Sequence, residues 1–259
     1  MNSSNNSTPL DNGVFKTKVN SGAITYGTFL GLASPVAAEI CALAGLDWLL
    51  LDLEHGAGGE EQVGPTVVAA GAYGVPVLVR VESLERIRIG RVLDAGAAGI
   101  MVPRVENLSQ VKEVIKHMST PPYGDRGVAT YNRSARWGRD LEFLNGPSKL
   151  ACIVQIETIE ALESVGQIAA LDEVDVLFIG PADLSFALGV PRDFKNTKFI
   201  EALNKVLAAC KKNNKAAGIL AFSPESAIEY REMGFNFIAV NSDSTFLAGV
   251  IETTLKKIK

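Results

Sequence analysis

The feature that most constrains this chain is a regular alternation of short apolar runs with helical patterns. The apolar runs are rich in β-branched residues and carry almost no polar side chains, which is typical of parallel strands buried on both faces. The runs cover residues 24–30, 48–52, 76–80, 99–102, 151–156, 176–179, 216–220 and 237–240. Helical patterns follow at residues 35–44, about 60–72, 85–94, 108–118, 159–171, 199–213, 224–233 and 245–257.

Eight such βα units in one chain of this length favour an α/β fold of the (β/α)8 TIM-barrel type. An open doubly wound sheet is the alternative, although no Gly-x-Gly-x-x-Gly or Walker loop follows an early strand. No linker divides the chain, so we expect a single domain over residues 13–259. Residues 1–12 are polar and lack the apolar segment of a secretory signal, so we expect a disordered tail; a processed organelle precursor stays open.

The charge balance and the cysteines narrow the classes of partner and compartment. A net charge of -4, with no basic cluster, gives no footprint for nucleic acid. No run of about 18 apolar residues is present, so we expect no membrane span. The three cysteines show no Cys-x-x-Cys spacing and fall inside apolar patterns, which indicates reduced, buried thiols and a cytoplasmic protein.

Reactive side chains gather where the predicted strands end. In a parallel barrel these ends meet on the face that carries the chemistry. Asp52 and His55 follow the second run, and Arg80 ends the third. The spacing suggests that Asp52 fixes the tautomer of His55, which would then be a proton shuttle; a turn histidine is the alternative. Arg80 suits an anion or a developing enolate oxygen, and a salt bridge to a neighbouring carboxylate such as Asp52, Glu54 or Glu157 is its alternative.

Two further carboxylates, Glu157 and Asp183, follow the fifth and sixth predicted strands. Carboxylates on neighbouring strands, without cysteine or a histidine pair, favour an oxygen-liganding ion such as Mg²⁺ or Mn²⁺. Such a site leaves room for a chelating 2-oxo acid, whose ketone the ion would polarise. A helix cap at Glu157 and a turn aspartate at Asp183 are the alternatives.

One long irregular segment, residues 120–147, interrupts the alternation. It follows a helix and precedes a strand, so we expect it on the barrel face away from the chemistry. Its content of Arg126, Arg133, Arg136 and Trp137 is high for a connector. We therefore expect it to pack against another subunit, with a solvated basic loop as the alternative.

Several motifs together resemble the HpcH/HpaI aldolase family of class II, metal-dependent pyruvate aldolases. The similarity covers nearly everything after the first dozen residues. The motifs are Asp52-Leu-Glu-His55, Arg80 at the end of Val-Leu-Val-Arg, Pro121-Pro-Tyr-Gly-Asp-Arg-Gly127, Ala135-Arg-Trp137, Gln155-Ile-Glu157 and Gly180-Pro-Ala-Asp-Leu-Ser185.

The resemblance implies a phosphoenolpyruvate/pyruvate-type barrel whose C-terminal helix is exchanged between subunits, in a trimer or a hexamer. It also implies reversible cleavage of a 4-hydroxy-2-oxo acid, of the 2-keto-3-deoxy sugar acid type, into pyruvate and an aldehyde. The divalent cofactor would be Mg²⁺, Mn²⁺ or Co²⁺.

By the same likeness, each candidate side chain receives a role. Glu157 and Asp183 would bind the metal, Arg80 would hold the pyruvoyl oxygen, and His55 with Asp52 would transfer protons. The substrate-binding residues implied are Gln155, Ala182, Asp183 and Phe29. The amides of Ala182 and Asp183 would receive the pyruvate carboxylate, and Phe29 falls where relatives often carry a tryptophan that shapes the aldehyde pocket.

Two other functions remain to be weighed against the aldolase. An acyl-CoA lyase of the citramalyl or malyl type would use a similar barrel and metal pair, with a groove for the CoA tail. A non-catalytic metabolite-binding barrel would keep the fold without the turnover. No lysine stands at a predicted strand end, which argues against a Schiff-base route.

Overall fold

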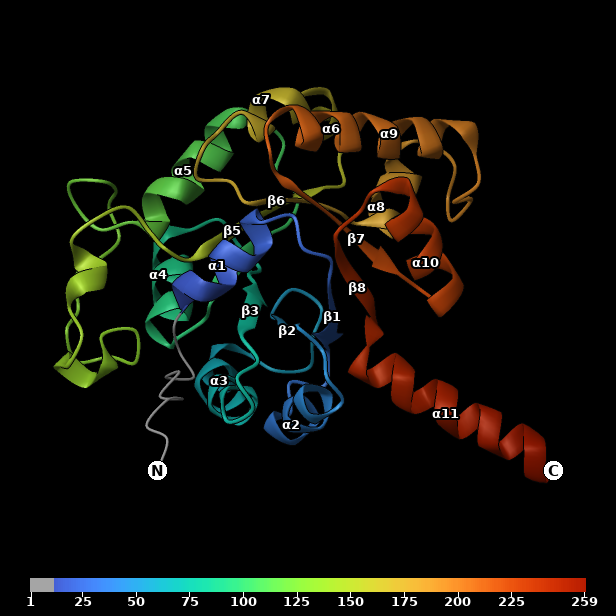
Figure 1. The fold of residues 1–259 in the computed structure, drawn as a ribbon, viewed down its shortest axis with the longest axis horizontal. Helices are drawn as coiled ribbons and strands as arrows, with labels where there is room; N and C mark the ends of the chain where they lie inside the picture. The colour runs from blue at the N-terminus through green and yellow to red at the C-terminus, as the bar shows by residue number, and fades with distance from the viewer. Residues whose placement is uncertain (1–11) are drawn as a thin grey trace, which may run out of the picture.

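The computed structural model describes residues 12–259 and contains a closed barrel of eight parallel strands in sequential order (Figure 1). The barrel prediction is therefore confirmed, and the open sheet is excluded. The strands are β1 (Thr25–Leu30), β2 (Trp48–Asp52), β3 (Val77–Arg80), β4 (Gly99–Val102), β5 (Ala151–Ile156), β6 (Val176–Ile179), β7 (Ala216–Ala221) and β8 (Phe237–Ser242). The tail predicted for residues 1–12 lies outside the described residues, except for Asn12, the first residue of α1.

Helices surround the barrel at nearly all the predicted places. They are α1 (Asn12–Asn20), α2 (Pro35–Leu43), α3 (Val63–Gly71), α4 (Arg86–Asp94), α5 (Leu108–Met118), α6 (Ile159–Glu163), α7 (Val165–Ala169), α8 (Pro181–Ala187), α9 (Thr197–Lys212), α10 (Pro224–Met233) and α11 (Asp243–Ile258). Short 3-10 helices are η1 (Glu60–Gln62), η2 (Arg136–Gly138) and η3 (Glu142–Leu144).

Three helix predictions need correction. The helix expected at residues 159–171 is broken into α6 and α7 at Ser164, whose backbone leaves the helical region (ψ 2°). The helix expected from residue 60 begins as the 3-10 helix η1 before α3. The short helix α8, which follows β6, was not among the expected helices. Its first residue is Pro181, a residue well suited to the first turn of a helix.

Large aromatic side chains fill the interior of the barrel. The rings of Trp48 and Phe237 stack with centroids 4.1 Å apart, and Phe178 meets Phe237 edge-on at 6.3 Å. Gly27 makes room for this stack, because a Cβ there would lie 2.2 Å from the Trp48 ring. The interior below the strand ends is thus a packed core rather than a channel.

The amino end of the barrel is covered by α1, which lies across it in Figure 1. Phe15 of α1 is buried and meets the Phe237 ring edge-on. Lys16 Nζ lies 3.1 Å from the buried Asp175 carboxylate, and Asn20 donates a hydrogen bond to the same side chain. These contacts tie the helix to the start of β6.

The irregular segment packs at this same end of the barrel. Arg126 pairs with Asp94 at the end of α4, and the Ser134 amide donates to the Asp94 carbonyl. Since α4 ends where β4 is about to begin, the segment lies on the face expected from the sequence. Within residues 12–259, each helix is too short or too polar to span a lipid bilayer.

Candidate active site

The carboxyl ends of β2 and β3 bring Asp52 and Arg80 side by side. The two residues are register partners in neighbouring strands. Arg80 donates from Nε to Asp52 Oδ1 (2.8 Å) and from Nη2 to Asp52 Oδ2 (2.6 Å), a bidentate pair that is buried. A guanidinium held in this way has a fixed plane, which a loose lysine could not provide.

Two other groups also contact the Arg80 guanidinium. Its Nη1 lies 3.0 Å from Glu54 Oε2, and its Cζ lies 5.1 Å from the centroid of the Phe29 ring. Burial alone would lower the pKa of Arg80, but the hydrogen bonds and charge of Asp52, with the charges of Glu54 and Glu157, raise it. The salt-bridge alternative for Arg80 is therefore realised with Asp52 and Glu54. The pairing does not remove the arginine from the cavity, which Arg80 still lines.

The predicted contact between Asp52 and the His55 ring is wrong. Asp52 turns its carboxylate to Arg80, and its Oδ1 accepts hydrogen bonds from the backbone amides of Glu54 (3.1 Å) and His55 (3.3 Å). Burial would raise the pKa of Asp52, yet Arg80 and the two amides outweigh it, so the pKa is lowered. The His55 ring is 69% exposed, lines the cavity, and has Glu54 Oε2 at 3.8 Å from its Nε2.

Glu157 is held in one orientation just beyond the end of β5. Its Oε1 accepts a hydrogen bond from the backbone amide of Arg104 (2.7 Å), and its Oε2 accepts one from Gln155 Nε2 (2.8 Å). Gly180, just after β6, allows this approach, because a Cβ there would lie 2.5 Å from Glu157 Oε2. The carboxylate is therefore fixed from two strands and one loop.

The electrostatics around Glu157 fit a divalent cation. Burial, together with the charges of Asp183 and Glu54, raises the pKa of Glu157 to about 7, although the Arg104 amide and Arg80 oppose the shift. Such a carboxylate lacks compensating positive charge, which a cation would supply. Next to it, the Oε1 of Gln155 is buried and accepts no hydrogen bond in the described structure, so it could accept one from a bound water.

The number of protein ligands in this corner is small. Among residues 12–259, no three or more His, Cys, Asp and Glu side chains converge in a way that could hold a metal ion. The pair of Glu157 and Asp183 would thus supply two oxygen ligands and leave the other positions to water and substrate. Mg²⁺ is bound in proteins in this manner, through one or two carboxylates.

A cavity of about 320 Å³ opens over these strand ends. All but one of the predicted site residues line it, namely Phe29, Asp52, His55, Arg80, Gln155, Ala182 and Asp183. Glu157 does not line it, although its carboxylate is hydrogen-bonded to Gln155 and lies against Gly180, which do. The amides of Ala182 and Asp183 belong to the first turn of α8, where Gly180 provides no capping side chain. The outer wall is formed by Leu220 in β7 and Phe222 just after it, by Asn241 and Ser242 at the end of β8, and by Ser244 and Thr245 in the first turn of α11.

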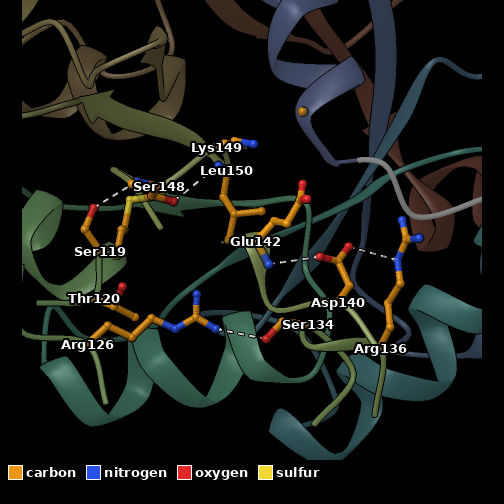
Figure 2. Close-up of a pocket in the computed structure, with 13 residues that line it drawn as sticks. Ser119, Thr120, Arg126, Ser134, Arg136, Asp140, Glu142, Ser148, Lys149 and Leu150 are labelled. Atoms are coloured by element: carbon orange, nitrogen blue, oxygen red, sulfur yellow. Dashed lines mark hydrogen bonds and ion pairs between the residues drawn. The ribbon is translucent and has the colours of Figure 1, made fainter. Parts of the chain in front are cut away.

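A second cavity, of about 250 Å³, lies in the irregular segment, at the opposite end of the barrel. Figure 2 shows its walls, with Arg126 beside Ser134, Arg136 beside Asp140, and Ser148 near Ser119. Its side chains are largely paired with one another, and the carboxylate pair is absent from its lining. The strand-end cavity is therefore the candidate active site.

One contributor to the site is predicted from the sequence only as an alternative, and another is not predicted. Glu54, an alternative ion-pair partner of Arg80 in the sequence analysis, does contact Arg80, and it also meets the edge of the His55 ring. Arg104 contributes only its backbone amide, from a left-handed conformation (φ 50°) that is uncommon for a residue other than glycine. The sequence carries no signal for such a contact.

The comparisons with known proteins agree with one another on the family that this chain resembles. The sequence model of the HpcH/HpaI aldolase/citrate lyase family matches residues 25–249. A 4-hydroxy-2-oxo-heptane-1,7-dioate aldolase of Escherichia coli is 35% identical over 92% of this chain and 92% of its own length. A hydroxypyruvate/pyruvate aldolase of Pseudomonas aeruginosa is 37% identical over 90% of this chain and 88% of its own.

A solved structure extends the likeness to the fold. The crystal structure of an HpcH/HpaI aldolase/citrate lyase family protein from Burkholderia cenocepacia superposes with a TM-score of 0.90 at 34% identity. The match covers 95% of this chain and 99% of that one.

Proposed function

The chain belongs to the HpcH/HpaI aldolase/citrate lyase family and is a carbon–carbon lyase of its aldolase type, and from that premise we propose how its site acts. The proposed reaction is the reversible cleavage of a 4-hydroxy-2-oxo acid into pyruvate and an aldehyde. The observation that carries it is the juxtaposition of a fixed guanidinium, Arg80, with the buried, under-compensated carboxylate of Glu157.

A metal ion would be held by Glu157 and Asp183, where it would act as a Lewis acid on the substrate's ketone. The protein's own groups supply the rest of the electrostatics. Arg80 donates to the oxygen on which the enolate charge develops, a role commonly worth a few kcal/mol per donor. The amides of Ala182 and Asp183, in the first turn of α8, would receive the substrate carboxylate.

Proton transfer is assigned to His55, which lines the cavity at its exposed side. A base must take the proton from the C4 hydroxyl, after which the C3–C4 bond breaks into the aldehyde and the enolate of pyruvate. The enolate then takes a proton at C3 to give pyruvate. Asp52 contributes through Arg80, whose plane it fixes, and not through the His55 ring.

The aldehyde part of the substrate would face the outer wall of the cavity. Phe29, Leu220 and Phe222 provide apolar surface there, and the hydroxyls of Ser242, Ser244 and Thr245 provide hydrogen-bonding groups. This mixture suits a short hydroxylated chain. We therefore propose a 2-keto-3-deoxy sugar acid as the substrate class.

We also propose that the enzyme is a homo-oligomer in which α11 packs against another copy of the chain. This helix extends away from the barrel in Figure 1. Its exposed side chains include many apolar ones along its length. Its half-exposed or exposed apolar residues are Phe246, Leu247, Val250, Ile251, Leu255 and Ile258. A surface of this kind on a projecting helix favours exchange between subunits, in a trimer or a hexamer.

The thiols support placing the enzyme in the cytoplasm. Cys41, Cys152 and Cys210 are all free, and burial raises the pKa of both Cys152 and Cys210 to about 12. Buried thiols of this kind are unreactive and form no redox pair.

The decisive experiment is a pyruvate-release assay across a panel of 4-hydroxy-2-oxo acids, with and without Mg²⁺, Mn²⁺ or Co²⁺. We expect release that is lost on exhaustive chelation and restored by the ion. Activity that survives chelation, or a covalent pyruvate adduct trapped by borohydride, would contradict the metal-dependent route. Turnover only with CoA thioesters would favour the acyl-CoA lyase, and ligand binding without turnover would favour the non-catalytic barrel.

A further inference from the structure

We propose that Glu54 is a positioning residue of this enzyme, which acts on the reaction by fixing the Arg80 guanidinium from the edge that Asp52 leaves open. The inference rests on the proposed function. Glu54 itself does not line the cavity, whereas Arg80 does, so its effect must pass through another side chain.

The contacts of Arg80 differ between the two carboxylates. A guanidinium has five N–H groups. Asp52 accepts hydrogen bonds from Nε and from Nη2, whereas Glu54 forms an ion pair with Nη1 at 3.0 Å. Asp52 thus leaves three N–H groups, one on Nη2 and both on Nη1. Without Glu54, the outer nitrogen Nη1 would have no protein partner to hold it against the pull of a ligand.

Burial makes this third contact more than an ordinary surface pair. The side chains of Arg80 and Glu54 are only 10% and 14% exposed, so solvent screens their interaction weakly. The Phe29 ring covers the guanidinium at 5.1 Å, which restricts its tilt. Glu54 also meets the edge of the His55 ring, so it touches both of the groups assigned to the chemistry.

The charge of Glu54 has a second effect on the site. Asp52 and Glu54 together carry one more negative charge than Arg80 can balance. This excess negative charge acts on the part of the site around Glu157 and so favours a cation in that corner. Removal of the Glu54 charge should therefore weaken the binding of Mg²⁺ modestly, even though Glu54 is not a ligand.

The test is a double-mutant cycle between Glu54 and Arg80, with kcat for pyruvate release as the readout. We expect Glu54→Ala to lower kcat about 10- to 100-fold, because a buried ion pair that holds the guanidinium is lost, with a smaller change in KM. Glu54→Gln keeps an oxygen acceptor for Nη1 and should lose less. In an Arg80→Lys background, Glu54→Ala should cost less than about threefold, because the group that it positions is gone.

A matched control is Glu82→Gln, which removes a carboxylate paired with an arginine outside the cavity and should leave kcat unchanged. Equal losses from Glu54→Ala in both backgrounds, or no loss in either, would overturn the proposal. Should Glu54→Ala fail to fold, as judged by circular dichroism, the cycle is run with Glu54→Gln. A wild-type enzyme without pyruvate release would refute the proposed function; the same cycle, read as calorimetric affinity for oxalate with Mg²⁺, would still decide the role of Glu54.

Discussion

The substitution Gly180→Ala is expected to lower the activity of this enzyme much more than its stability. The backbone of Gly180 (φ -84°, ψ 94°) is open to any residue, so alanine adds no backbone strain. The new Cβ would, however, lie 2.5 Å from Glu157 Oε2 and 3.1 Å from Gln155 Nε2. About nine in ten Cβ contacts in proteins are 3.4 Å or longer, so the carboxylate must move by about 0.9 Å.

Glu157 cannot make this movement freely. It is only 4% exposed, and both its oxygens are held, by the Arg104 amide at 2.7 Å and by Gln155 at 2.8 Å. A shift of this size breaks at least one of the two hydrogen bonds and displaces the proposed metal ligand. A displacement of about 1 Å in a reacting group can cost on the order of 100-fold in rate, so we expect kcat/KM to fall about 10- to 100-fold.

The assay compares pyruvate release, Mg²⁺ affinity and thermal unfolding for Gly180→Ala and for Gly90→Ala. Gly90 lies in α4, and a Cβ added there would meet nothing within 4 Å, so its substitution should add about 0.5–1 kcal/mol of stability and leave activity intact. Gly180→Ala should unfold a few degrees below the wild-type temperature, because the loss of one hydrogen bond to a buried carboxylate costs about 1–3 kcal/mol. Full activity with unchanged Mg²⁺ affinity in Gly180→Ala would refute the fixed-carboxylate reasoning.

Three other changes test the remaining parts of the site. Asp52→Asn should remove a part of the folding stability that depends on pH. The pKa of Asp52 is lowered in the folded state, so its contribution to stability is present above the unfolded value of about 3.9 and is lost as the pH falls through the folded value. Urea unfolding below about pH 4 should therefore show a smaller loss of stability in the variant than in the wild type. Glu157→Gln should weaken Mg²⁺ binding at least tenfold in calorimetry; unaltered affinity would exclude it as a ligand. Charged residues introduced together at Leu247 and Val250 of α11 should dissociate the proposed oligomer, as measured by light scattering. An unchanged mass would show that this surface is not an interface.

The barrel could be predicted because its signal is local. Runs such as that of β3 are apolar, β-branched and short, and they are separated by helical patterns, so their number and order already imply the closed sheet. The break at Ser164 was missed because apolar residues continue at helical spacing on both sides of it. Helix α8 was missed because its few residues give too short a pattern.

The site was predictable as a set of residues but not as a set of contacts. Asp52 was assigned to His55 because they are three residues apart, whereas the strand register places Asp52 against Arg80, 28 residues later in the chain. The role of Glu54 depends on that same arginine, and the role of Arg104 depends on a backbone amide. The sequence offers Asp52 and Glu54 only as alternative partners of Arg80 and gives no sign of the Arg104 contact, because tertiary pairing decides all three.

The stacked rings of Trp48 and Phe237, together with α1 at the amino end of the barrel, also affect the order in which ligands enter and leave the enzyme. Because the interior of the barrel is closed at its amino end, substrate and both products use a single opening, at the carboxyl ends of the strands. Gln155 and Gly180 lie at the strand ends, whereas Phe222 is 43% exposed at the rim. In the proposed site the aldehyde faces the outer wall of the cavity, so pyruvate would leave after the aldehyde and, in the synthetic direction, would enter before it.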